Sequence, residues 1–198
     1  DFIPSISLNP YDDSNNELII TFTGGYIEMA SNAAEANDSV ELNLINKNGT
    51  GLPFDVAIYS SLILKSDDNS QAATNADMAM IGTEEGIYYT SNFTSNNPTW
   101  TLSNMGIGSK VPVTRLVQQR HNLEDAKSIY YTKSYINDSA VVTETTVDFP
   151  GTYNHGWIYA ATYGRGVFCT DQFGEKGWKA PSYQKVVANN NLHIYPNP

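Results

Sequence analysis

Cysteine is nearly absent from this sequence, because Cys169 is the only one among 198 residues. A single cysteine can form no internal disulfide, and it excludes zinc sites that need several thiolates. The three histidines, His121, His155 and His193, lie far apart and beside no carboxylate at ligand spacing. We therefore interpret Cys169 as a buried strand thiol and the histidines as surface or loop residues.

Basic residues and long apolar runs are also scarce. Eleven lysines and arginines stand against 21 aspartates and glutamates, which leaves a net charge of -10 at pH 7. A chain of this charge repels nucleic acid and anionic lipid, so we expect it to bind neither. No apolar run is long enough to span a bilayer. Residues 1–4 lack the pattern of a signal peptide, so we expect any export signal to lie outside this sequence.

Stretches with helical spacing are missing as well. Tyrosine, threonine, isoleucine and valine recur instead in short runs, and this composition favours β-structure. At 198 residues the chain is long enough to bury one substantial core. The sequence therefore predicts an all-β domain.

Three segments of the chain repeat one pattern, a β-rich run, a short turn with a glycine, and a second β-rich run. The segments start at Leu18, Met78 and Ile158, and they align on Gly25, Gly86 and Gly166. The pattern predicts three β-hairpins. Three unrelated hairpins would be the alternative to a true repeat.

Further strands are expected on both sides of each hairpin. A preceding run is introduced by proline, which suits a strand entry; these runs are SISL after Pro4, FDVAI after Pro53 and VTRLV after Pro112. A following run completes each repeat: VELNLI from Val40, TWTLSN from Thr99, and the stretch around Trp178. Repeated units of four antiparallel strands predict β-propeller blades, at about residues 3–50, 51–106 and 110–183.

Three blades are too few to close a propeller, which takes about four to eight. We therefore expect the chain to be the C-terminal part of a larger propeller, completed by further blades of the same precursor.

The third repeat carries an insertion near residues 121–156. It contains the two strand-like runs SIYYTKSYI and VVTETTVDF, which predict an added, projecting hairpin. Projecting segments often carry binding function, and aromatic side chains can stack on a ligand. Tyr130, Tyr131 and Tyr135 are therefore the candidate binding residues, whereas the other strand tyrosines are expected to pack between blades.

The stretch TSNFTSNNPTW from Thr90 and the stretch TDQFGEKGW from Thr170 resemble the Asp-box motif of BNR-type propellers, which include sortilin-like and sialidase proteins. The first stretch keeps Trp100 but has Asn92 in place of the usual aspartate. The second offers Asp171, Gly174 and Trp178. The first repeat has no such tryptophan. The resemblance implies that Trp100 and Trp178 are structural residues of the repeat.

The C-terminal part resembles exported propellers of Bacteroidetes. IYAATYGRGVF at 158–168, preceded by VPVTRLVQQ from Val111, is similar to their closing blade. A polar linker follows at 184–191, and LHIYPNP at 192–198 resembles the start of a type IX secretion system sorting domain. The resemblance implies passage through the outer membrane to the cell surface or the medium. An ordinary turn at residues 195–198 is the alternative.

Two kinds of modification or ligand site follow from short motifs. Asp38-Ser39-Val40 and Asp138-Ser139-Ala140 resemble the O-glycosylation sites of exported Bacteroidetes proteins, which makes Ser39 and Ser139 candidate attachment points. The acidic runs DDSNNE from Asp12 and SDDNS from Ser66 offer oxygen ligands for calcium. Solvated turns are the favoured interpretation of both runs, and no other cofactor is expected.

No catalytic residue is assigned from this sequence. The predicted function is a non-catalytic propeller module at the cell surface that binds glycan or protein, or serves a structural role. The alternative is a glycoside hydrolase of the sialidase or xyloglucanase kind, with its two carboxylates on blades outside this chain. A third possibility is a partner or cargo of the type IX export machinery.

Overall fold

The computed structural model describes residues 2–10, 12, 14, 16–36, 41–64, 78–104, 106–120, 127–135, 141–149 and 154–171. Within these ranges every regular element is a β-strand, so the predicted all-β class is confirmed. The same part of the chain contains no helix that is long and apolar enough to cross a membrane.

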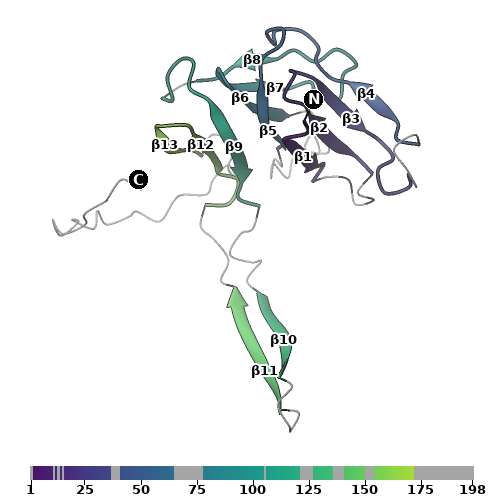
Figure 1. Cartoon of the computed structure of the whole chain (residues 1–198), viewed down its shortest axis with the longest axis vertical. Coiled ribbons are helices and arrows are strands. Elements are labelled where there is room, and N and C mark those ends of the chain that lie inside the picture. The colour runs from purple at the N-terminus through teal and green to yellow at the C-terminus, as the bar shows by residue number, and fades with distance from the viewer. Residues whose placement is uncertain are drawn as a thin grey trace, which may run out of the picture.

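The strands form antiparallel sheets in which most paired strands are also neighbours along the chain (Figure 1). Sheet one comprises β1 (Ser5–Leu8), β2 (Leu18–Thr21), β3 (Ile27–Ala30) and β4 (Leu44–Asn46). Sheet two comprises β5 (Ile58–Ile63), β6 (Ala79–Thr83), β7 (Gly86–Thr90) and β8 (Thr101–Leu102). Sheet three comprises β9 (Val113–Gln118), β12 (Ile158–Thr162) and β13 (Gly166–Thr170). Strands β10 (Lys127–Tyr135) and β11 (Val141–Phe149) pair with each other.

The three larger sheets share a backbone hydrogen-bond plan. In each sheet, the residue after the first strand donates its N–H to the carbonyl of the residue before the second strand. These bonds are Asn9 to Glu17, Leu64 to Met78 and Gln119 to Trp157, each with an N···O distance of 2.9 Å. The connection between the first two strands is therefore closed in the same way in all three sheets, although its length differs widely.

The hairpin β10–β11 belongs to that same connection in sheet three. Its nine residue pairs run from Lys127 opposite Phe149 to Tyr135 opposite Val141, so the predicted inserted hairpin is confirmed. Figure 1 shows it extending away from the three larger sheets.

One predicted strand is in the wrong place. The run FDVAI was expected to open sheet two, but β5 begins only at Ile58. Asp55 has a φ of 60°, which breaks an extended strand, and Phe54 is exposed at the preceding position. The proline at 53 therefore precedes a turn. The expected strand around Trp178 lies outside the described residues.

Two apolar cores hold the sheets together. One lies between sheets one and two and includes Ile19, Ile27, Ile58, Ile81 and Trp100; the other lies between sheets two and three and includes Leu62, Met80, Ile87, Val113 and Ile158. Sheet two contributes to both, so both of its faces are covered, and β6 is buried along its whole length. The first strands also meet, because β5 contacts both β1 and β9.

Candidate functional site

A polar hollow of about 210 Å³ lies where the three first strands meet. Its lining includes Ser5 and Ser7 from β1, Tyr59, Ser60 and Ser61 from β5, and Thr114 and Arg115 from β9. These side chains come together because β5 contacts both β1 and β9. We call this feature the polar hollow.

Serine hydroxyls fix the walls of the polar hollow. The hydroxyl of Ser7 donates to the carbonyl of Ser61 at 2.6 Å, and the backbone N–H of Ser61 donates to Ser5 Oγ at 3.0 Å. On the other side, the N–H of Leu116 donates to Ser60 Oγ at 3.0 Å. These bonds tie β1 to β5 and β5 to β9, so the relative positions of the three strands are set by side chain-to-backbone hydrogen bonds.

Arg115 gives the polar hollow its positive charge. Its side chain is exposed, so its guanidinium can contact a ligand that enters the polar hollow. Together with the surrounding hydroxyls it offers donors and acceptors for an oxygen-rich ligand. The described lining can therefore bind such a ligand by hydrogen bonding.

The predicted binding tyrosines lie on a different part of the molecule. In the hairpin, Tyr130 is opposite Thr146, Tyr131 opposite Thr145 and Tyr135 opposite Val141. Because this hairpin extends away from the sheets (Figure 1), the structure does not bring these three residues to the polar hollow. Ligand contact by these tyrosines stays a prediction.

The repeat glycines open or precede the third strand of each sheet. Gly25, Gly86 and Gly166 have φ values of 83°, 132° and 86°. The hydroxyl of Thr83 donates to the carbonyl of Gly86 at 2.9 Å, and that of Thr162 donates to Gly166 at 2.8 Å. Gly86 and Gly166 therefore occupy equivalent positions in their hairpins.

Two asparagines, which the sequence analysis overlooked, brace the hairpins of sheets one and two. Asn104 accepts the N–H of Ile87 at 2.9 Å and donates its amide to the carbonyl of Glu85 at 2.9 Å. Asn48 makes the same two bonds, at 3.0 Å to Ile27 and 2.6 Å to Gly25. We call this arrangement the asparagine clamp. In sheet two, its two bonds lie on either side of Gly86. In sheet one, they lie on either side of Tyr26, one position after Gly25, which aligns with Gly86 in the sequence. The available sequence signal was an asparagine two residues after each fourth strand.

Trp100 anchors sheet two on sheet one. Its side chain is buried, its indole Nε1 donates to the carbonyl of Lys47 at 3.0 Å, and its ring packs edge-on against Phe93 with centroids 6.3 Å apart. Asn92, just before this anchor, accepts the N–H of Thr99 at 2.9 Å and the hydroxyl of Thr90 at 2.8 Å. A side-chain oxygen is thus sufficient to brace this turn without a charge.

Lys47 is a buried cation beside this anchor. Its ammonium donates to the carbonyls of Ser95 at 2.9 Å and Thr94 at 3.2 Å, and lies 5.5 Å from the centre of the Phe93 ring. Burial lowers the pKa of Lys47, and the charge of Glu17 partly offsets this effect. The cation therefore serves to join the two sheets.

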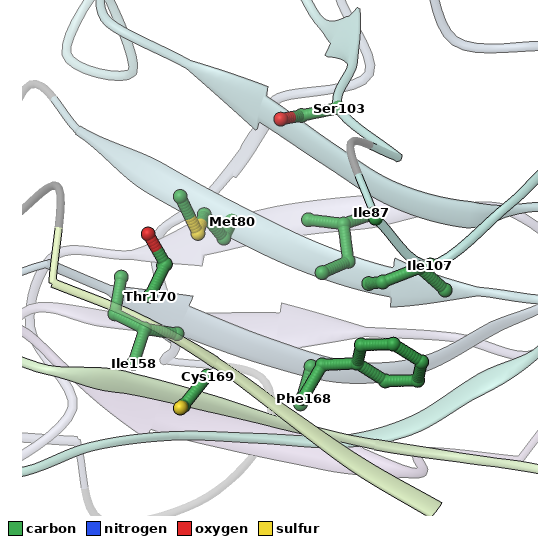
Figure 2. A pocket seen from close by; sticks show the side chains of 10 residues that line it. Met80, Ile87, Ser103, Ile107, Ile158, Phe168, Cys169 and Thr170 are labelled. Carbon is green, nitrogen blue, oxygen red and sulfur yellow. The ribbon is translucent and has the colours of Figure 1, made fainter. Parts of the chain in front are cut away.

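A second, apolar hollow of about 220 Å³ lies between sheets two and three (Figure 2). Met80 and Ile87 form one wall, and Ile158, Ala160 and Phe168 form the other. We call this feature the apolar hollow.

Cys169 is exposed, so its interpretation as a buried thiol is wrong. It follows Phe168 in β13, and alternate residues of a strand lie on opposite faces. Phe168 packs toward sheet two, which leaves the Cys169 side chain on the face that no described sheet covers. His155 lies in a turn, as the loop interpretation expected, but it is buried.

The described part of the acidic run from Asp12 forms a hydrogen-bonded turn. Asp12 accepts hydrogen bonds from the hydroxyl and N–H of Ser14 and from the N–H of Glu17, and these bonds lower its pKa, that from the Ser14 hydroxyl most. Among the residues that the structure describes, no group of three or more His, Cys, Asp or Glu side chains is arranged to hold a metal ion.

Several predicted sites lie outside the described residues. They are Ser39, Ser139, Trp178, His121, His193, the acidic run 66–70, the linker at 184–191 and the sorting motif at 192–198.

The polar hollow, the apolar hollow and the hairpin are therefore features of the described chain from which a function can be argued. No family model, no curated protein and no solved structure matches the chain significantly.

Proposed function

We propose that the three sheets are blades of an exported β-propeller whose ring is completed by further blades of the same precursor. Two observations support this architecture: the shared hydrogen-bond plan of the sheets, and the contacts of β5 with both neighbouring first strands. First strands that meet along a row of antiparallel sheets are what a radial arrangement requires.

The open faces of the outer sheets support the need for further blades. Ile6 and Leu8 in β1 are 58% and 48% exposed, and Val117 and Val167 in sheet three are 45% and 69% exposed. Exposed apolar side chains on the outer sheets mark a face that another layer can cover.

As its function, we propose non-catalytic binding or adhesion at the cell surface, with glycan or protein as the ligand. The single observation that carries this proposal is the polar hollow, which combines fixed hydroxyls with the exposed guanidinium of Arg115. Concave sites with a few converging polar groups are the usual places of ligand binding.

Export by the type IX secretion system is part of the same proposal. Its support is the resemblance of residues 192–198 to a sorting domain and of 158–168 to a closing blade. In the native host, we expect the protein in the outer-membrane or extracellular fraction, with added sugar mass on the peptides that contain Ser39 and Ser139. Recovery of the unmodified protein from the cytoplasm would contradict both export and glycosylation.

The binding proposal can be tested with a glycan array and a protein pull-down from the cell surface. Arg115→Ala is expected to weaken binding about tenfold, since it removes a charge-assisted hydrogen bond from the polar hollow. Arg165→Ala is the matched control, because this exposed arginine lies in the turn between β12 and β13. Equal loss in both variants would contradict a site in the polar hollow.

A glycan hydrolysis assay with the full-length precursor distinguishes binding from catalysis. If the full-length precursor releases sugars from a glycan mixture, and two opposed carboxylates on other blades are needed for it, the glycoside hydrolase alternative replaces the binding module. A ring of blades seen by electron microscopy of the precursor is expected in either case, and a closed sandwich would refute the propeller.

A further inference from the structure

A third hollow, of about 180 Å³, lies beside the turn of the first hairpin. One wall is the turn between β2 and β3, at residues 24–26, and the other comes from the connection between β4 and β5, within residues 48–55. The two walls are in close contact, because a Cβ built on Gly25 would lie 3.1 Å from the carbonyl oxygen of Val56. This hollow shares no lining residue with the polar hollow.

Two exposed aromatic rings belong to the lining of this third hollow. Phe54 is 87% exposed and Tyr26 is 47% exposed. Leu52 and Pro53 add apolar surface to the same lining. Asp55 is exposed, and it is the one charged side chain among the lining residues that the structure describes. We call this feature the aromatic hollow.

The backbone beside the aromatic hollow follows the plan of the repeat. Asp55 lies three residues before β5 and has a φ of 60°, and Lys110 lies three residues before β9 and has a φ of 56°. Both residues therefore adopt a left-handed conformation at the entry of a first strand. Their side chains have opposite charges, so the turn itself does not require the carboxylate of Asp55.

The repeat does not require the two aromatic rings either. In the connection from β8 to β9, Ser109 stands at the place of Phe54, one residue before the left-handed position. The clamp bonds lie on either side of Tyr26 in sheet one and of Gly86 in sheet two, so these two residues also correspond. The rings and the negative charge are thus particular to the aromatic hollow, whereas the next connection has glycine, serine and lysine at these places.

The chemistry of the lining favours a cation over a sugar. Asn48 uses its amide oxygen for the N–H of Ile27 and its amide nitrogen for the carbonyl of Gly25, at 3.0 and 2.6 Å. A sugar hydroxyl both donates and accepts hydrogen bonds, so a sugar site needs several converging donors. The described lining offers chiefly two aromatic rings and one carboxylate, and both kinds of group attract positive charge.

We propose that the aromatic hollow binds a quaternary ammonium group, with the rings of Tyr26 and Phe54 against its methyl groups and Asp55 as its counter-charge. A primary ammonium is strongly hydrated, whereas a methylated one has an apolar surface that suits Leu52 and Pro53. The hollow is smaller than the roughly 300–1,000 Å³ of pockets that enclose drug-sized ligands, so it fits a single group. The net charge of -10 also attracts cations to the protein.

The inference does not depend on the ligand of the polar hollow, and an NMR titration of the 198-residue chain tests it. Choline chloride is expected to shift the backbone amide signals of Gly24, Gly25 and Asp55 saturably, and glucose is expected to leave them in place. The affinity for choline should fall as sodium chloride is added, because salt screens an exposed charge pair. A trimethyllysine peptide is the second ammonium probe. Tighter binding of the peptide would assign the group to a methylated protein partner, and tighter binding of choline to a small molecule; both results support the site.

Two variants separate the contributions of charge and ring. Asp55→Asn keeps a residue that tolerates the left-handed backbone, and it is expected to weaken choline binding about fivefold and to reduce its salt dependence. Asp171→Asn, at another exposed aspartate, is the matched control. Phe54→Ala is expected to weaken binding about threefold through loss of the cation–π contact. Its control is Tyr163→Ala, which removes a ring that is 77% exposed in the turn between β12 and β13.

Several outcomes would overturn the proposal. One is the absence of a saturable shift with either ammonium probe, and another is a stronger response to glucose, which would make the hollow a sugar site. Equal affinities for choline in Asp55→Asn and Asp171→Asn would also overturn it. Phe54 and Asp55 are both exposed, so their variants are expected to fold, and the dispersion of their amide signals checks this.

Discussion

Asn104 bonds to the backbone on both sides of Gly86, and a Cβ on that glycine would overlap the asparagine side chain. The amide oxygen accepts the N–H of Ile87, and the amide nitrogen donates to the carbonyl of Glu85. Asn104, two residues after the fourth strand of sheet two, thus holds the turn between β6 and β7 through one side chain, and its position leaves no room for a Cβ at residue 86.

Replacing Gly86 with alanine tests this steric requirement. Gly86→Ala is expected to lower the free energy of unfolding by about 2 kcal/mol or more, since it combines a strained backbone at φ 132° with a clash. Gly166→Ala is the control, because a Cβ there meets no atom within 4 Å, and its cost is expected to be about 1 kcal/mol from the backbone alone. Denaturant titrations of both variants measure the difference, and equal costs would contradict the clash.

Removing the clamp itself leaves two backbone groups without their partners. Asn104→Ala is expected to destabilise the protein by about 1–3 kcal/mol, the usual cost of unpaired polar groups. Asn48→Ala should cost a similar amount, because it breaks the same pair of bonds in sheet one. Asn97→Ala, at an exposed position, serves as the control. Thermal unfolding that shows no difference between the clamp variants and this control would argue against the clamp.

Trp100 is the largest fully buried side chain of the described core. Trp100→Ala is expected to cost about 3–5 kcal/mol, since it creates a cavity and leaves the Lys47 carbonyl without the indole donor. Leu102→Ala, two residues further along and 48% exposed, should cost less than about 1 kcal/mol. Calorimetry of the two variants checks the contrast, and a small effect of Trp100→Ala would mean that sheets one and two associate without this anchor.

Stability at alkaline pH should depend on Tyr88. Burial raises the pKa of its phenol above the ordinary value of 10.0, and the charge of Glu85, 3.3 Å from the hydroxyl, adds to this effect. The folded state therefore keeps a proton that the unfolded chain loses near pH 10. The contribution of the Tyr88 phenol to the free energy of unfolding is fully present below that pH, and it is lost as the pH rises through the pKa of Tyr88 in the folded state.

Tyr88→Phe should therefore show a shallower fall in unfolding free energy above pH 10 than the wild type. Urea titrations at a series of pH values between 8 and 11, about the ordinary tyrosine pKa, measure the two slopes. A variant that loses stability as steeply as the wild type would show that Tyr88 does not carry this dependence.

The errors of the sequence interpretation share a cause. The strand at FDVAI was placed by its proline and its apolar alternation, but Asp55 has a left-handed backbone that propensity does not reveal. Cys169 was assigned to the interior because its residue type is usually buried. Its exposure depends on which face of sheet three has a neighbour, and a pattern within one strand cannot specify this.

Local pattern alone determined the hairpins, the inserted strand pair and the order of strands within each sheet, because turn chemistry and a two-residue period act over a few neighbouring residues. Only the tertiary structure decided which sheets meet and what lies between them. Ser5 bonds to Ser61, and Trp100 to the carbonyl of Lys47, across 56 and 53 residues of chain. No local preference specifies such pairs, because they depend on how whole sheets stack.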